Sequence, residues 1–147
     1  MAGVPEVCGR FYARRKARRP APAVQQSTVR PMNAARERRR RIRSLNDEFR
    51  TGGPPSGGKG RWLLTRGVLA LGEEHVGIAL SLMRDFSSFD EANDPHGEHD
   101  FGVIQVAGER LYWKIDYYNN SLDGGSEDPA DEATTHRVLT LMLASEY

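Results

Sequence analysis

The first regular pattern of apolar and polar positions along the chain is helical. Ile42, Leu45 and Phe49 recur at spacings of three and four residues on one narrow stripe, with arginine-rich sequence around it. This spacing predicts a helix over residues 34–50, for which Asn33 is a suitable N-cap.

A loop, a short strand and a second helix are predicted next. The glycine- and proline-rich stretch TGGPPSGGKG (51–60) predicts a flexible loop, and the apolar run RWLLT (61–65) predicts a strand. A helix is expected over residues 72–85, where acidic residues in the first turn complement the helix dipole. The apolar positions of this helix form a wide stripe, which predicts that it is well buried. They are Val76, Ile78, Ala79, Leu80, Leu82 and Met83.

Two alternating segments, DFGVIQV (100–106) and ERLYWKIDYY (109–118), predict a β-hairpin. Ala-Gly at its turn is a weaker turn sequence than Asn-Gly, and it fixes the register less firmly. The predicted register is the one in which Val106 faces Glu109. His99 then stands opposite Asp116. The core face of the hairpin is predicted to carry Ile104, Val106, Leu111 and Trp113. The other face is predicted to carry Phe101, Val103, Tyr112, Lys114 and Asp116.

The C-terminal sequence SEDPADEATTHRVLTLMLASEY predicts a last helix. Asp128 is a suitable N-cap and Pro129 fits the first helical position. An apolar stripe follows, made of Val138, Leu141 and Met142. The predicted fold is therefore α+β with the order α-β-α-β-β-α. A three-stranded, largely antiparallel sheet packs against helices in a single domain over residues 32–147.

Residues 1–31 are rich in arginine and proline and poor in apolar residues, which predicts a disordered basic arm. Because the helical pattern begins just behind Met32, either Met1 or Met32 is expected to start the natural protein. The single cysteine, Cys8, excludes an internal disulfide. No secretory h-region and no apolar run of transmembrane length is present, so we expect a cytoplasmic protein without membrane contact.

Charge is distributed very unevenly. Residues 1–50 carry 14 Lys/Arg and 4 Asp/Glu, a net charge of +10, whereas residues 51–147 carry 7 and 16, a net charge of −9. A basic arm on an acidic body points to a charged partner. The acidic half is expected to repel nucleic acid. Alternatively, it imitates nucleic acid, since carboxylates can occupy phosphate-binding sites that are lined by arginine.

The sequence HGEHD concentrates ionisable groups ahead of the hairpin. The candidates are His96, Glu98, His99 and Asp100, with the distant His136. They could bind a divalent ion, although a structural zinc site usually contains cysteine and no helical His-Glu-x-x-His is present. Alternatively, Asp116 orients His99 for acid/base chemistry, without a recognisable nucleophile. The remaining alternatives are a polar entrance to the strand and a recognition surface for a macromolecule.

Two further stretches carry candidate binding residues. In WKIDYY (113–118), aromatic rings could stack on bases while Lys114 contacts phosphate, although Asp116, Tyr118 and the acidic surroundings favour ordinary cross-strand pairing. The run RERRRRIR (36–43) is usually a solvated helix face. Nucleic-acid contact through it would be weak and independent of sequence. Its central arginines are Arg38, Arg39, Arg40 and Arg41.

Five longer stretches of the chain form a specific combination: RIRSLNDEFR, LLTRGVLALG, FDEANDPHGEHDFG, GERLYWKIDYY and SEDPADEATTHRVLTLMLASEY. Together they resemble one bacterial family, the domain-of-unknown-function 3768 family. The resemblance covers about residues 40–147. It implies a cytosolic bacterial protein associated with mobile elements and carries no settled activity.

The expected function is therefore that of a non-enzymatic binding protein of mobile elements. It would act through protein contacts, conceivably as an inhibitor of a host defence complex of the CRISPR or restriction type, and we expect no cofactor. One alternative is a divalent-metal-dependent hydrolase or nuclease built on residues 96–100 with Asp116. The other is a weak nucleic-acid-binding accessory protein that uses the basic helix.

Overall fold

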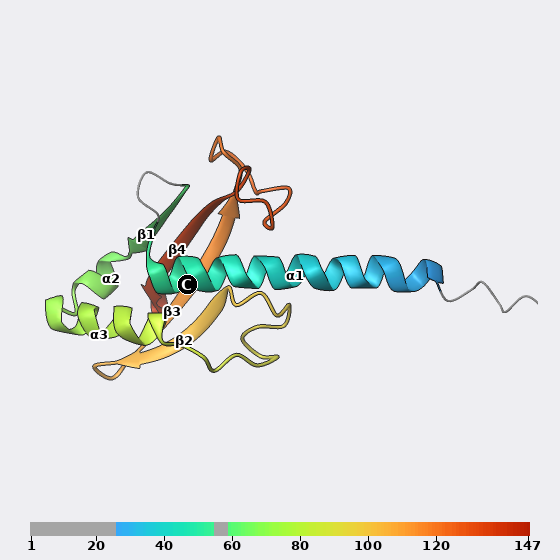
Figure 1. Ribbon diagram of the computed structural model, residues 1–147. Helices are drawn as coiled ribbons and strands as arrows, with labels where there is room; N and C mark the ends of the chain where they lie inside the picture. The colour runs from blue at the N-terminus through green and yellow to red at the C-terminus, as the bar shows by residue number, and fades with distance from the viewer. Residues whose placement is uncertain (1–25, 55–58) are drawn as a thin grey trace, which may run out of the picture.

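The computed structural model describes residues 26–54 and 59–147 (Figure 1). Its elements in chain order are α1 (Gln26–Gly52), β1 (Gly60–Leu64), α2 (Arg66–Leu69), α3 (Glu73–Arg84), β2 (Phe101–Val106), β3 (Glu109–Tyr118), β4 (His136–Leu143) and the 3-10 turn η1 (Ala144–Glu146). The α+β class is confirmed, but the sheet has four strands in the order β1-β4-β3-β2 instead of three. β1 runs parallel to β4, and the other neighbours are antiparallel. No helix of the described ranges is long and apolar enough to cross a membrane.

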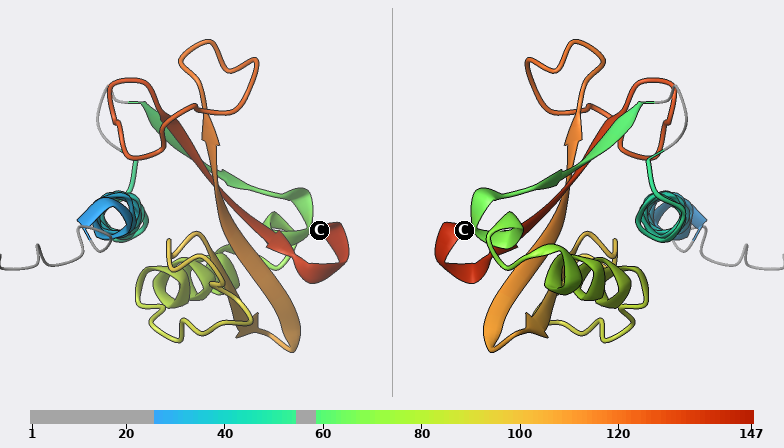
Figure 2. Two further views of the ribbon diagram at one scale, coloured as in Figure 1. Left: turned by 90° about the vertical axis from the view of Figure 1, so that its right-hand side faces the viewer. Right: turned by 90° about the vertical axis from the view of Figure 1, so that its left-hand side faces the viewer.

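Helices cover only one face of the sheet. α1 and α3 lie on the same side of it, and no helix in the described part of the chain covers the opposite face (Figure 2). The core fills the space between these helices and the sheet. Its buried side chains are Phe49, Val68, Ala79, Met83, Ile104, Val106, Leu111, Trp113, Ile115, Leu139 and Leu141.

The predicted hairpin is confirmed with its register, since Val106 pairs with Glu109 and Phe101 with Lys114. The predicted core-face residues are buried. Ala107 and Gly108 both have positive φ, 53° and 77°, as a type I′ turn requires. On the core face, Gly102 leaves room for the Trp113 indole, because a Cβ there would lie 2.5 Å from Nε1 of Trp113.

The predicted C-terminal helix is wrong, because residues 136–143 form the strand β4. β4 is central in the sheet, with β1 on one side and β3 on the other. Leu139 and Leu141 point into the core, whereas Val138 and Met142 lie on the opposite face of the strand. All four side chains are buried. A strand buried on both faces reads as a continuous apolar run, and such a run also matches helical spacing. Asp128 caps no helix and lies in the loop before β4.

The predicted helices differ in extent and burial. α1 begins at Gln26, ahead of the predicted Asn33 cap, and ends at Gly52 inside the predicted loop. The rest of the predicted arm, residues 1–25, lies outside the described residues, as do residues 55–58 of the predicted loop. α3 is confirmed, but it is less buried than predicted, because Ile78 and Leu82 are 44% and 41% exposed. The short helix α2 was not predicted.

Candidate functional site

The HGEHD sequence lies in the loop between α3 and β2, and Asp94 shapes that loop. This aspartate is buried, and its Oδ1 accepts hydrogen bonds from the backbone N–H groups of Glu98 at 2.8 Å and His99 at 3.2 Å. The turn requires positive φ at Gly97, 66°, and at His99, 55°. Asp94 therefore fixes the position from which the His99 ring reaches into the body.

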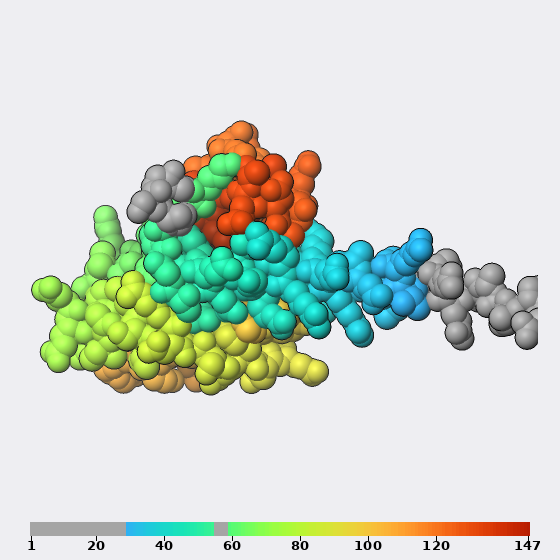
Figure 3. All heavy atoms as spheres, in the orientation of Figure 1, coloured from blue at the N-terminus to red at the C-terminus, as the bar shows by residue number. Residues whose placement is uncertain are grey.

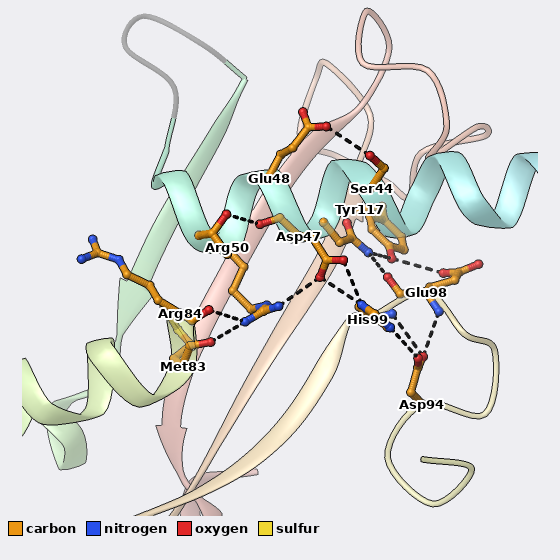
Figure 4. A network of polar contacts seen from close by, with 12 residues as sticks. Ser44, Asp47, Glu48, Arg50, Met83, Arg84, Asp94, Glu98, His99 and Tyr117 are labelled. Atoms are coloured by element: carbon orange, nitrogen blue, oxygen red, sulfur yellow. Dashed lines mark hydrogen bonds and ion pairs between the residues drawn. The ribbon is translucent and has the colours of Figure 1, made fainter. Parts of the chain in front are cut away.

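His99 points at helix α1 instead of across the hairpin (Figure 4). Its Nδ1 lies 3.0 Å from both carboxylate oxygens of Asp47, and its Nε2 lies 3.8 Å from Oδ2 of Asp94. The ring stacks on Phe89 with centroids 3.7 Å apart and an interplanar angle of 3°. The predicted partner, Asp116, instead forms an ion pair of 2.7 Å with Lys114, whose pKa it raises.

From Asp47 the polar network continues to the end of α3. Asp47 Oδ1 accepts a 3.0 Å hydrogen bond from Nη2 of Arg50, which is buried. Nη1 of Arg50 donates to the carbonyls of Met83 and Arg84 at 2.7 and 2.8 Å. The last carbonyls of a helix lack partners within the helix and carry its negative dipole end. A buried arginine therefore ties α1 to the C-terminus of α3.

A second branch of the network starts from Asn46, which is 0% exposed. Its Nδ2 donates to the Glu98 carbonyl at 2.9 Å and to the Tyr117 hydroxyl at 2.7 Å, and its Oδ1 accepts from Nε of Arg137 at 2.9 Å. Burial is the main reason why the pKa of Tyr117 is raised and the pKa of Arg137 is lowered. The Tyr117 hydroxyl donates onward to Glu98 at 3.2 Å.

The geometry assigns this network to holding the fold together. Both ring nitrogens of His99 face carboxylates of the same chain, and its ring is stacked. Over the described ranges, no group of three or more His, Cys, Asp or Glu side chains could hold a metal ion. Asp100 lies in the same loop, and burial together with the Glu98 carboxylate raises its pKa. Residues 96–100 therefore include a structural joint, and His96 stays exposed outside it.

The predicted arginine cluster divides into two pairs. Arg38 Nε lies 3.0 Å from Asp128, and Arg41 Nη2 lies 2.8 Å from Glu132, so these two arginines hold the loop before β4. Arg39 and Arg40 are exposed. The sequence did not indicate which arginines the body neutralises, because their partners lie about 90 residues away.

Tyr118, the remaining candidate, lines a groove on the face of the sheet opposite the helices. The groove has a volume of about 310 Å³. We call it the sheet groove, and it is lined by Arg61, Leu63, Tyr118, Leu122 and Val138. Leu63 and Leu122 are 45% and 42% exposed.

Several network residues were missed from the sequence, namely Asn46, Asp47, Arg50, Asp94, Tyr117 and Arg137. One pattern pointed to two of them. Asn46 follows Ile42 by one helical turn and Arg50 follows Asn46 by another, so polar residues extend the buried stripe of the helix. A polar residue on a buried stripe needs a partner, which is what the network supplies.

Residues 64–146 match the family described as protein of unknown function (DUF3768). This match spans more than half of the chain. The chain belongs to the DUF3768 family. No curated protein and no solved structure matches it. The DUF3768 region contains His99, Tyr117, Arg137 and most of the sheet, whereas α1 with Asn46 and Asp47 precedes it.

Proposed function

We propose that this protein is a non-enzymatic binding protein that acts by docking onto another protein. The observation that carries the proposal is the sheet groove, on the face of the sheet opposite the helices. The groove is concave and combines apolar side chains with a tyrosine and an arginine, and Tyr and Arg are enriched among the residues that dominate binding energy. It fits an apolar side chain of the partner that is flanked by an acidic one, which would face Arg61.

Backbone strain beside the groove supports the same proposal. Leu122 has a φ of 59°, a left-handed conformation that is unfavourable for a branched side chain, and it is nonetheless 42% exposed. Leucine here gains less from burial in the free protein than a core leucine does. Strained residues of this kind cluster at binding sites, and contact with a partner would give the exposed leucine the burial that it lacks.

The ionisable residues of the His99 network support a non-enzymatic role. An acid/base catalyst needs a ring nitrogen within hydrogen-bond reach of a substrate. Asp47 lies against Nδ1 of His99, Asp94 lies near Nε2, and Phe89 covers one ring face. The sheet groove contains none of these residues.

A narrower form of the proposal names the partner class. The acidic residues of the second half of the chain would bind arginine-lined sites of a nucleic-acid-binding complex. A protein of a mobile element would use such binding to inhibit a host defence complex. This form predicts that the bound protein is a component of a CRISPR-type or restriction complex.

The test is affinity purification of the tagged full chain from its native host, comparing two matched double variants. Leu63→Thr with Leu122→Asn makes the groove polar, while threonine suits a strand and asparagine tolerates positive φ. Ile78→Gln with Leu82→Gln changes two side chains of similar exposure on α3. We expect a stoichiometric protein partner with the natural chain and the α3 variant, and at least tenfold less with the groove variant.

Circular dichroism and urea unfolding establish that both variants are folded before they are compared. Loss of the partner with the α3 variant alone would place the docking surface on α3 and overturn the groove. Absence of any stoichiometric protein partner of the natural chain would overturn the proposal as a whole.

A further inference from the structure

Helix α1 extends well beyond the body of the protein. Its first turns project past the sheet and the surrounding loops (Figures 1 and 3). The side chains of residues 29–41 are all exposed, and the helix becomes buried only from Ile42 onward. An exposed helix segment of this kind is stabilised by its docked continuation and leaves most of its surface open to a partner.

The arginines of this helix fall into two groups. Arg38 and Arg41 are held by Asp128 and Glu132 of the loop before β4. In the described residues, no ion pair or hydrogen bond involves the side chains of the other four arginines between residues 36 and 43. We call these four the arginine stripe: Arg36, Arg39, Arg40 and Arg43.

The stripe occupies one continuous face of α1. Its members are spaced i, i+3, i+4 and i+7, the positions that lie on one side of a helix. Like charges at these spacings repel, each pair costing about 0.2–0.5 kcal/mol of helix stability. The body relieves this repulsion for Arg38 and Arg41 alone, so an anion that neutralises the stripe would be bound favourably.

We infer that the arginine stripe binds the phosphate backbone of nucleic acid, independently of the sheet groove. At a rise of about 1.5 Å per residue, the stripe spans about 10 Å, over which one DNA strand presents about three phosphates. Guanidinium groups bind phosphate bidentately. Between residues 36 and 43 the one apolar side chain, Ile42, is buried, so the stripe lacks the apolar centre of a protein interface.

The pairing of nearby acidic side chains makes this contact compatible with the acidic body. Two of the acidic side chains closest to the helix, Asp128 and Glu132, are already neutralised by Arg38 and Arg41. The contact depends on phosphate charge and not on base sequence, so we expect similar affinity for any duplex sequence.

The experiment measures fluorescence anisotropy of a labelled duplex of about 20 base pairs with the full chain between 50 and 200 mM salt. Arg36→Gln with Arg40→Gln removes two stripe arginines, and Arg38→Gln with Arg41→Gln removes the two paired ones. Both variants lose the same net charge. Both keep residues 1–25, so the six basic side chains of that segment contribute equally to binding in the two variants. All four substituted side chains are exposed, so both variants should fold.

We expect the stripe variant to bind about tenfold or more weakly, and its log–log salt slope to be shallower by about two, because two phosphate contacts are lost. The paired-arginine variant should keep most of the affinity and slope. Equal losses in both variants would show that net charge alone attracts the duplex and would overturn the inference. No binding at 50 mM salt would also overturn it, and a protein partner that depends on Arg36 and Arg40 would then identify an acidic protein as the ligand.

Discussion

Nδ1 of His99 lies 3.0 Å from both carboxylate oxygens of Asp47, although the two residues are 52 positions apart in the chain. The contact joins the docked part of α1 to the loop before β2. His99 and Asp47 therefore help to decide the direction in which the projecting part of the helix points. The residues that most resembled a catalytic cluster in the sequence position the basic helix instead.

Removing the His99 ring is expected to destabilise the fold. His99→Asn keeps a residue that tolerates the φ of 55° and deletes both the stack on Phe89 and the reach of Nδ1 to Asp47. We expect a loss of about 1–2 kcal/mol in the free energy of unfolding, measured by urea denaturation. His96→Asn is the matched control, because His96 is exposed in the same loop, and it should change stability by less than about 0.5 kcal/mol. Equal effects of the two variants would contradict the structural role.

Asn46 should be more costly to remove than any exposed polar residue of α1. Asn46→Ala deletes three hydrogen bonds in a fully buried setting and leaves Nε of Arg137 without its partner. We expect about 2–4 kcal/mol of destabilisation in urea. Ser44→Ala removes a hydrogen bond to Glu48 on the exposed side of the same helix and should stay within about 0.5 kcal/mol. A small effect at Asn46 would mean that the network adds little to stability.

The sequence predicted the elements whose pattern is local. The hairpin register followed from a two-residue turn, because turn length and alternation together leave one pairing that buries Trp113 and Leu111. α3 followed from its helical spacing. β4 did not, because a central strand with both faces buried has no alternation of apolar and polar residues to distinguish it from a helix.

The polar partner of His99 differs from the one expected from the sequence. His99 was expected to meet a carboxylate, which it does, but the hairpin register suggested Asp116 and the fold supplies Asp47. Contacts between α1 and the loop before β2 depend on how these two segments pack against each other. The spacing of residues within either segment does not specify that packing. The same holds for Arg38 and Arg41, whose partners are set by the position of the loop before β4.

Asp100 is expected to make the fold less stable as the pH rises through its titration. Burial, followed by repulsion from Glu98, raises the pKa of Asp100 above its ordinary value of 3.8. The folded chain then binds this proton more tightly than the unfolded chain, so the contribution of Asp100 to stability is fully present below pH 3.8 and is lost as the pH rises through the folded pKa. Asp100→Asn should be more stable than the natural chain at pH 7, and the difference should vanish below pH 3.8. Urea unfolding midpoints of both proteins across this pH range measure the difference in stability. If Asp100→Asn were less stable than the natural chain at pH 7, the expected direction would be wrong.

Glu146 is expected to act in the opposite direction. A hydrogen bond from Thr65 at 2.5 Å and others from the backbone N–H groups of Leu143 and Gly67 lower the pKa of this carboxyl below 4.5. Its contribution to stability is present above pH 4.5 and is lost as the pH falls through the folded pKa. Glu146→Gln should therefore be less stable than the natural chain at neutral pH and similar to it in strong acid. A Glu146→Gln variant that is as stable as the natural chain at neutral pH would contradict this role of the carboxylate.

The hairpin turn offers a stabilising substitution that touches no other part of the structure. Ala107 is exposed and has a φ of 53°, a left-handed conformation that costs an ordinary residue about 1–2 kcal/mol and that asparagine tolerates far better. With Gly108 at a φ of 77°, Ala107→Asn creates the Asn-Gly pair that type I′ turns favour. We expect a gain of about 0.5–1 kcal/mol, seen as a higher urea midpoint with an unchanged denaturant slope. Ala107→Val, which is poorly suited to positive φ, should lower the midpoint. If both variants shifted it in the same direction, the turn conformation would not be the cause.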